Sequence, residues 1–123
     1  MAGRAQALLT PNEVVLRLSE LSRQLDAVVT TLREAEVDAA QKRHAADLAE
    51  SRAFVASEGA MELRKHLARI AAARAEDEAL VAEATLRWLR QRIRAIDTAI
   101  EVGRSYGAAV RAELKTLDYG ESA

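Results

Sequence analysis

The sequence predicts an all-α protein: a long antiparallel helical hairpin, packed like a coiled coil, with a short third helix at its C-terminal end. Two observations lead to this fold class. Apolar residues recur three and four positions apart over most of the 123 residues, and long stretches contain neither proline nor glycine. Half of the residues are apolar but only 3% are aromatic, so thin packing of helices is favoured over a thick globular core.

The first helix is expected over residues 11–56. Thr10 can cap the free amides of its first turn, Pro11 suits the first helical position because it has no amide to satisfy, and Glu13 completes a capping box. Its apolar stripe consists of Leu18, Leu21, Leu25, Val28 and Leu32. Beyond this stripe the helix becomes rich in alanine, and its length is typical of a coiled coil.

Residues 57–59, Ser-Glu-Gly, are expected to reverse the chain. Ser57 suits the N-cap of a second helix, and Glu58 and Glu62 would lie near its start, where acidic side chains interact favourably with the helix dipole. The alternative is one continuous helix through Gly59, because glycine inside a helix costs only about 1 kcal/mol relative to alanine.

A pairing test favours the hairpin. In an antiparallel pair, residues that face each other have numbers that add up to a constant. The apolar residues give sums of 117 or 118: Leu18 with Ile100, Leu21 with Ile96, Leu25 with Ile93, Val28 with Leu89, Leu32 with Leu86, Val37 with Leu80, and Leu48 with Ile70. Charged residues give weaker support with similar sums: Asp26 with Arg90, Arg33 with Glu83, Asp47 with Arg69, Glu50 with Lys65, and roughly Glu20 with Arg94. The sums centre the turn on residues 58–59 and place the alanine-rich stretches 39–46 and 71–79 against each other.

The second helix is expected over residues 60–103. Its apolar stripe consists of Leu86, Leu89, Ile93, Ile96 and Ile100. Past Gly103 the first helix has no residues left to pair with, and the two glycines at 103 and 107 allow a bend or a tight contact. A short third helix is therefore expected over residues 105–118, which either folds back on the open end of the hairpin or docks on a partner. All of these elements are assigned to a single domain, residues 1–123.

Apolar residues off the main seam predict self-association. They are Leu16, Val29, Phe54, Val55, Met61, Leu63 and Val81. A two-helix hairpin hides only one stripe, so these side chains would remain in water, and homodimerisation into a helical bundle would cover them.

One basic patch is the candidate functional site. It consists of Arg87, Trp88, Arg90, Arg92 and Arg94, with Arg104, Arg111 and Lys115 further along. Arginines neutralise phosphates and an exposed indole can stack on an unpaired base, so the patch is a candidate contact for nucleic acid or for a protein partner. The competing interpretation has Arg87, Arg90 and Arg94 flanking the seam beside acids of the facing helix. Trp88 would then cover the seam. The chain has a net charge of −1, and the patch contains only one aromatic residue, so this second interpretation is favoured.

Catalytic, metal-binding and cofactor-binding signatures are absent from the sequence. Cysteine is missing, His44 and His66 have no further ligand at metal-binding spacing, and no nucleophile–base order or phosphate-binding glycine loop is present. We therefore expect no enzyme activity, no cofactor, no metal and no small-molecule substrate. No secretory signal and no membrane span is recognisable, so we expect a cytoplasmic protein without membrane contact.

The run from Leu86 to Leu114, LRWLRQRIRAIDTAIEVGRSYGAAVRAEL, resembles small α-helical accessory proteins of tailed phages and prophages of high-GC Gram-positive bacteria. The chain is rich in Arg and Ala and poor in Lys, Phe and Asn, a composition similar to that of proteins encoded by such genomes. The resemblance implies an accessory role in the host cytoplasm, beside phage recombination or replication proteins, and brings no catalytic residues with it.

The expected function is therefore that of a non-enzymatic helical protein-binding or scaffolding accessory protein. Its expected partners are a second copy of the chain and an unidentified protein. The alternative is a nucleic-acid-binding accessory of phage recombination or replication that uses the basic face Arg87–Arg94.

Overall fold

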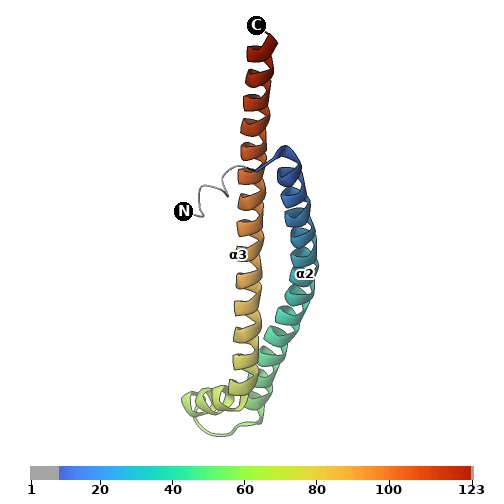
Figure 1. The fold of residues 1–123 in the computed structure, drawn as a ribbon. Coiled ribbons are helices and arrows are strands. Elements are labelled where there is room, and N and C mark those ends of the chain that lie inside the picture. Colours follow the sequence, from blue (N-terminus) through green and yellow to red (C-terminus); the bar gives the residue numbers. More distant parts are fainter. Residues whose placement is uncertain (1–8, 123) are drawn as a thin grey trace, which may run out of the picture. The chain divides into compact units, whose positions relative to one another are not determined.

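A computed structural model describes residues 9–122, and nearly all of them are helical. Helix α2 comprises Pro11–Ala56 and helix α3 comprises Met61–Ser122, and no strand occurs within residues 9–122 (Figure 1). The predicted all-α class, with two long helices joined near the middle of the chain, is confirmed. The chain divides into two compact units, which are described separately below. The first unit combines the chain up to Val28 with the chain from Arg92, and the second unit is Val29–Gln91.

The N-terminal end of α2 is held by the predicted capping box. The backbone amide of Glu13 donates to the hydroxyl of Thr10 at 3.2 Å, and the amide of Thr10 donates to the Glu13 carboxylate at 3.2 Å. The amide of Val14 also donates to the carbonyl of Thr10 at 3.1 Å. Three backbone amides are thus satisfied at the helix end, where no preceding turn can supply acceptors.

The turn after α2 lies where the sequence places it, but Ser57 has a different role. Its hydroxyl donates back to the carbonyl of Ala53 at 2.6 Å, so it closes the end of α2 and does not cap α3. Gly59 has a φ of 112°, a conformation in which a Cβ would be strained. Arg64 of α3 completes the turn, because its guanidinium donates to the carbonyl of Phe54 at 3.0 Å and lies 4.3 Å from the centre of the Phe54 ring. In Figure 1 the first turns of α3, coloured yellow-green, run at an angle to the rest of the helix, and no proline or glycine lies there to explain the bend.

In the first unit, aliphatic side chains fill the seam between the helices. Val14 on α2 and Ile96 and Ile100 on α3 are buried. The other members of the seam are half-buried: Leu18, Leu21, Leu25, Val28 and Ile93. The predicted stripes of both helices are therefore the ones that pack in this unit.

The register in the first unit differs from the predicted one by about one helical turn. A Cβ built on Gly103 would lie 2.8 Å from a methyl of Leu18, and one built on Gly107 would lie 3.0 Å from a methyl of Val14. Both pairs have numbers that add up to 121, whereas the predicted pairs add up to 117 or 118. A turn contains about 3.6 residues, so the sum test identifies the correct faces but not the correct turn.

The predicted short third helix is wrong. Helix α3 continues without interruption through Gly103 and Gly107 to Ser122. Two glycines cost about 1 kcal/mol each inside a helix, but here the absence of their side chains lets Leu18 and Val14 approach the α3 backbone. The tight contact is what these glycines provide, and the bend does not occur.

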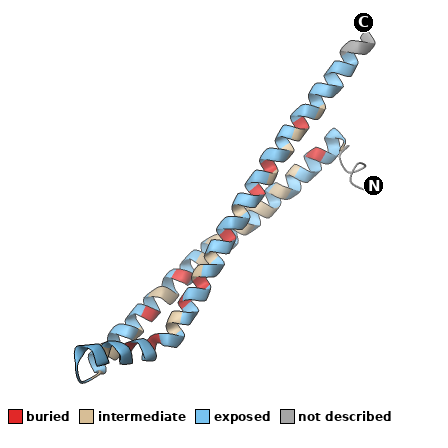
Figure 2. Ribbon diagram, turned by 90° about the vertical axis from the view of Figure 1, so that its left-hand side faces the viewer, coloured by how far each residue is buried: buried red, intermediate tan, exposed pale blue. Residues whose placement is uncertain are grey.

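In the second unit, alanines replace large side chains over most of the seam, and only its last layers, toward residues 29 and 91, keep the half-buried Leu32 and Leu86 and the buried Leu89. The buried alanines are Ala39, Ala46, Ala68, Ala72, Ala79 and Ala82. In both helices they continue the spacing of three and four residues that the large side chains of the first unit begin. Figure 2 shows how few residues are fully buried, in red, along either helix.

Two predicted pairs in the second unit are wrong. Leu80 is 51% exposed and Val37 is 58% exposed, and the side chains of Leu48 and Ile70 also face solvent. Equal sums place two residues at the same height along the hairpin but do not place them on the facing sides. Leu80 follows the buried Ala79 by one residue, which turns its side chain by about 100° away from the seam.

Candidate functional site

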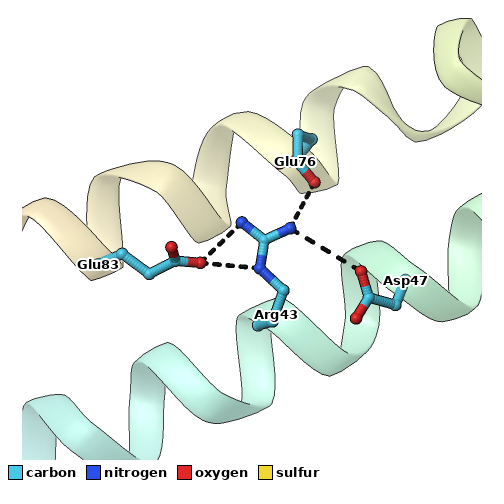
Figure 3. A network of polar contacts seen from close by, with 4 residues as sticks. All are labelled: Arg43, Asp47, Glu76 and Glu83. Atoms are coloured by element: carbon cyan, nitrogen blue, oxygen red, sulfur yellow. Dashed lines mark hydrogen bonds and ion pairs between the residues drawn. The ribbon is translucent and has the colours of Figure 1, made fainter.

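Arg43 on α2 joins the two helices of the second unit (Figure 3). Its Nη1 lies 2.6 Å from Glu76 on α3, and its Nη2 and Nε lie 2.7 and 2.8 Å from Glu83, two turns further along. Asp47, one turn further along α2, lies 3.8 Å from Nη1. The hydrogen bonds that Arg43 donates to Glu76, and then those to Glu83, raise the pKa of Arg43 above its ordinary value.

This cluster is a structural clamp and carries no acid–base chemistry. A guanidinium stays protonated throughout the range in which proteins fold, so Arg43 can neither accept nor deliver a proton. Its raised pKa means that its contribution to stability is present below the ordinary arginine pKa and would be lost only as pH rises through the still higher folded value. The clamp uses two acids, Glu83 and Asp47, that the sequence assigns to other partners, Arg33 and Arg69.

The heptad phase is the signal that could have found this clamp. Arg43, Glu76 and Glu83 each follow a seam position by one residue, and such positions meet across antiparallel coiled coils. The phase becomes visible only when the spacing of three and four is followed through the alanines. Sums of residue numbers do not reveal it.

Three of the predicted basic-patch residues belong to the second unit. Arg87 is exposed and Trp88 is 58% exposed, so most of the indole meets solvent and does not lie over the seam. Arg90 lies 3.9 Å from Glu36 on α2, which is an ion pair with an acid other than the predicted Asp26. Of the two arginines in this unit, only Arg90 therefore fits the interpretation that these residues flank the seam and pair with acids of the facing helix.

The remaining basic residues belong to the first unit and lie along α3. They are Arg92, Arg94, Arg104, Arg111 and Lys115, and all five are exposed. None of them forms an ion pair with another residue in the part of the chain that the structure describes. Glu20, the acid predicted to face Arg94, pairs with Arg23 on its own helix at 3.2 Å. The predicted patch is thus divided along α3 between the two units, with Arg87, Trp88 and Arg90 in the second and the other five residues in the first.

The seam of α3 continues past the start of α2. Gly107 faces Val14 close to the N-terminal end of α2, and the next seam positions, at the same spacing, are Val110, Leu114 and Leu117. Leu114 is 45% exposed and Leu117 is 63% exposed. All side chains from residue 111 to residue 118 are exposed, so this segment does not pack against α2.

A second stripe of α3, in the second unit, points away from the alanine seam. We call it the outer stripe, and its members are Leu63, Leu67, Ile70, Arg74, Asp77, Val81, Ala84 and Trp88. The spacing alternates between four and three, so all eight share one helix face. Every member is exposed. Over most of its length the second unit therefore places small residues inside and large apolar residues outside, a pattern typical of an interaction surface.

Within the described residues, no group of three or more histidine, cysteine or acidic side chains is arranged to hold a metal ion. His44 and His66 are both exposed. Neither of the two described helices is long and apolar enough to span a bilayer.

Comparison with protein-family models, with curated proteins and with solved structures found no match for this chain.

Proposed function

We propose that this chain is a non-enzymatic helical scaffolding protein that binds other helices, including a second copy of itself. The observation that supports this function is the inverted second unit, in which alanines fill the seam while large apolar side chains such as Ile70 and Val81 face solvent. Exposed apolar helix faces are the surfaces through which helical bundles assemble.

The exposed end of α3 supports binding of a further protein. Leu114 and Leu117 continue a coiled-coil seam beyond the end of α2, so they present the face that a helix from another protein would cover. The resemblance of residues 86–114 to phage accessory proteins supports the proposal that this partner is a phage or host protein, met in the host cytoplasm.

Sedimentation at micromolar concentration tests self-association. The chain has a mass of 13.4 kDa, and we expect a species of twice that mass that dissociates on dilution. A species of single-chain mass at every concentration would contradict self-association.

Capture from the source bacterium, with and without its phage genes expressed, tests the second surface. We expect one protein to be retained by the native chain and lost when Leu114 and Leu117 are both changed to glutamate. Thr116→Glu is the matched control, because Thr116 is exposed on the same segment but outside the seam. Retention by the double variant equal to that of the control would remove this surface from the proposal.

Nucleic-acid binding is the alternative function, and one observation favours keeping it. Arg87, Arg92 and Arg94 form no ion pair with any described residue, so their charges remain available to phosphates. If they contact phosphates, affinity for a single-stranded oligonucleotide falls with salt, with a slope of about 0.7 per contact on logarithmic axes. Replacing Arg87, Arg92 and Arg94 by glutamine would then abolish binding while preserving the helices. Wild-type binding that is weak and insensitive to salt would exclude this function.

A further inference from the structure

The outer stripe of α3 has an arrangement of side chains that complements itself. Apolar residues occupy both ends of the stripe, and its centre carries one basic and one acidic residue, Arg74 and Asp77. The Arg74 side chain is 94% exposed, and its one ion pair with a described residue is to Glu78 on its own helix, at 3.7 Å. Asp77 forms no ion pair with any other described residue. Both charges are therefore available to a partner.

An antiparallel copy of the same stripe matches it at every level. When residue numbers of the two copies add up to 151, the four layers are Leu63 with Trp88, Leu67 with Ala84, Ile70 with Val81, and Arg74 with Asp77. Each layer occurs twice, once on each side of a two-fold axis, as a symmetric dimer requires. The alternating spacing of four and three is what allows one sum to hold for all eight residues.

The flanking residues fit the same register. On either flank of the stripe, the nearest positions of the two copies are offset by two residues, so their numbers add up to 153 or 149. Leu80, which is exposed beside the stripe, would lie across from Ala73 of the second copy (sum 153), so a large side chain meets a small one. On the other flank, Glu78 would lie across from Ala71 (sum 149). No flanking position places two like charges against each other.

A parallel arrangement is unfavourable for the same stripe. In a parallel, in-register pair, Arg74 would face Arg74 and Asp77 would face Asp77. Like charges placed opposite each other cost affinity, whereas the antiparallel pair forms two attractive contacts at its centre. Charge complementarity thus selects both the orientation and the occupant.

We propose that two copies of this chain join through their outer stripes, antiparallel, about a two-fold axis between Ala75 and Glu76. This inference rests on the proposed self-association and names its surface and register. The central layers, from Ile70 to Val81, span about 16 Å of helix. Leu63, in the two outermost layers, belongs to the bent first turns of α3, so these layers form only if the second copy packs against that bent part. The central layers do not include the bent turns.

Cysteine cross-linking tests the register, because the chain contains no cysteine. Ile70→Cys and Val81→Cys are prepared as two separately tagged proteins, mixed and oxidised. We expect a disulfide-linked heterodimer in the mixture and little cross-linking in either protein alone. Like positions would lie about 16 Å apart along the antiparallel pair, and a disulfide needs Cα atoms within about 7 Å.

The control and the contrary outcomes are well defined. Val37→Cys, an exposed apolar position on α2 outside the stripe, should not cross-link to Ile70→Cys. Strong cross-linking of each variant with itself would indicate a parallel pair and overturn the inference. A dimer by sedimentation without any link between positions 70 and 81 would also overturn it, while leaving the proposed scaffolding function intact. A monomer would overturn both.

Charge exchange provides an independent test in the full chain. Arg74→Asp should weaken the dimer about tenfold, because two attractive contacts become two repulsive ones between exposed groups. Asp77→Arg should have a similar effect. The double variant Arg74→Asp/Asp77→Arg should restore the wild-type dissociation constant to within about threefold, since it restores both opposite-charge pairs. Equal dissociation constants for all four proteins, with unchanged helicity, would contradict the proposed centre.

Discussion

The two units of this chain both pack two antiparallel helices, but they use side chains of different size at the seam between them. In the first unit, large side chains such as Ile96 and Ile100 lie in the seam. In the second unit, alanines such as Ala79 and Ala46 fill most of the seam, which Leu89 completes, and large apolar residues such as Ile70 and Val81 lie outside it. Burial of apolar area is the main source of stability, so the first unit is stabilised chiefly within one chain.

The difference explains why the second unit carries the clamp and the candidate interface. An alanine side chain buries little apolar area. A seam of alanines therefore stabilises the helix pair less than a seam of leucines and isoleucines does. Arg43 with its carboxylates adds directional contacts that hold the register. The outer stripe offers further burial that only a partner can complete.

The largest expected effect is the loss of a seam side chain in the first unit. Ile96 is buried, and Ile96→Ala should lower the free energy of unfolding by about 2–4 kcal/mol, through lost burial and a residual cavity. Urea unfolding followed by circular dichroism measures it, at a fixed protein concentration. Val102→Ala, an exposed apolar position on the same helix, is the control and should change stability little. Equal effects at both positions would mean that the seam does not carry the stability of this unit.

The second unit should respond to the opposite change. Ala79 is fully buried, and Ala79→Leu should cost about 1–3 kcal/mol, because the helices must separate or adopt strained rotamers to admit the larger side chain. Ala40→Leu, at an exposed position of the same unit outside both the seam and the outer stripe, should be tolerated in the same unfolding measurement. A stabilising effect of Ala79→Leu would show that the alanine seam is underpacked, and the contrast between the units would fail.

Parts of this fold follow directly from local sequence. The capping box fixes the start of α2, because Thr10 and Glu13 need only their own helix end to form it. The turn near Gly59 follows from a residue that tolerates a positive φ. The aliphatic seam of the first unit is also predictable, because large apolar residues have a clear preference for burial.

Other parts depend on packing that local sequence does not encode. Alanine is common both inside and outside helical bundles, so the seam of the second unit could not be separated from its surface by residue type. The clamp at Arg43 depends on the register, and the register is determined jointly by all layers. The basic patch from Arg87 to Arg94 falls across the boundary between the two units, which no local pattern marks.

Two glycines test how closely the helices of the first unit approach. At Gly107, an added Cβ would lie 3.0 Å from buried Val14, whose branched side chain has few alternative rotamers. We expect Gly107→Ala to cost about 1 kcal/mol net, even though alanine favours the helix. Gly103→Ala should be close to neutral, because the atom it meets is the flexible end of half-buried Leu18. Thermal unfolding compares the two variants, and a larger loss at Gly103 would mean that Leu18 is the more rigid neighbour.

The smallest expected effect concerns the clamp of the second unit. Arg43→Met keeps a long side chain with good helix propensity but removes every hydrogen bond to Glu76 and Glu83. The Arg43 side chain is 34% exposed, so solvent screens these contacts and the midpoint of thermal unfolding should fall by a few degrees at most. Arg43→Lys keeps the charge but lacks the planar guanidinium that donates to both acids at once. Its unfolding midpoint should lie between those of the wild type and Arg43→Met. High salt should reduce the differences in unfolding midpoint among the three proteins, because screening weakens the charged contacts but leaves the alanine seam unchanged. If Arg43→Met were as stable as wild type at low salt, the alanine seam alone would hold the register of the second unit.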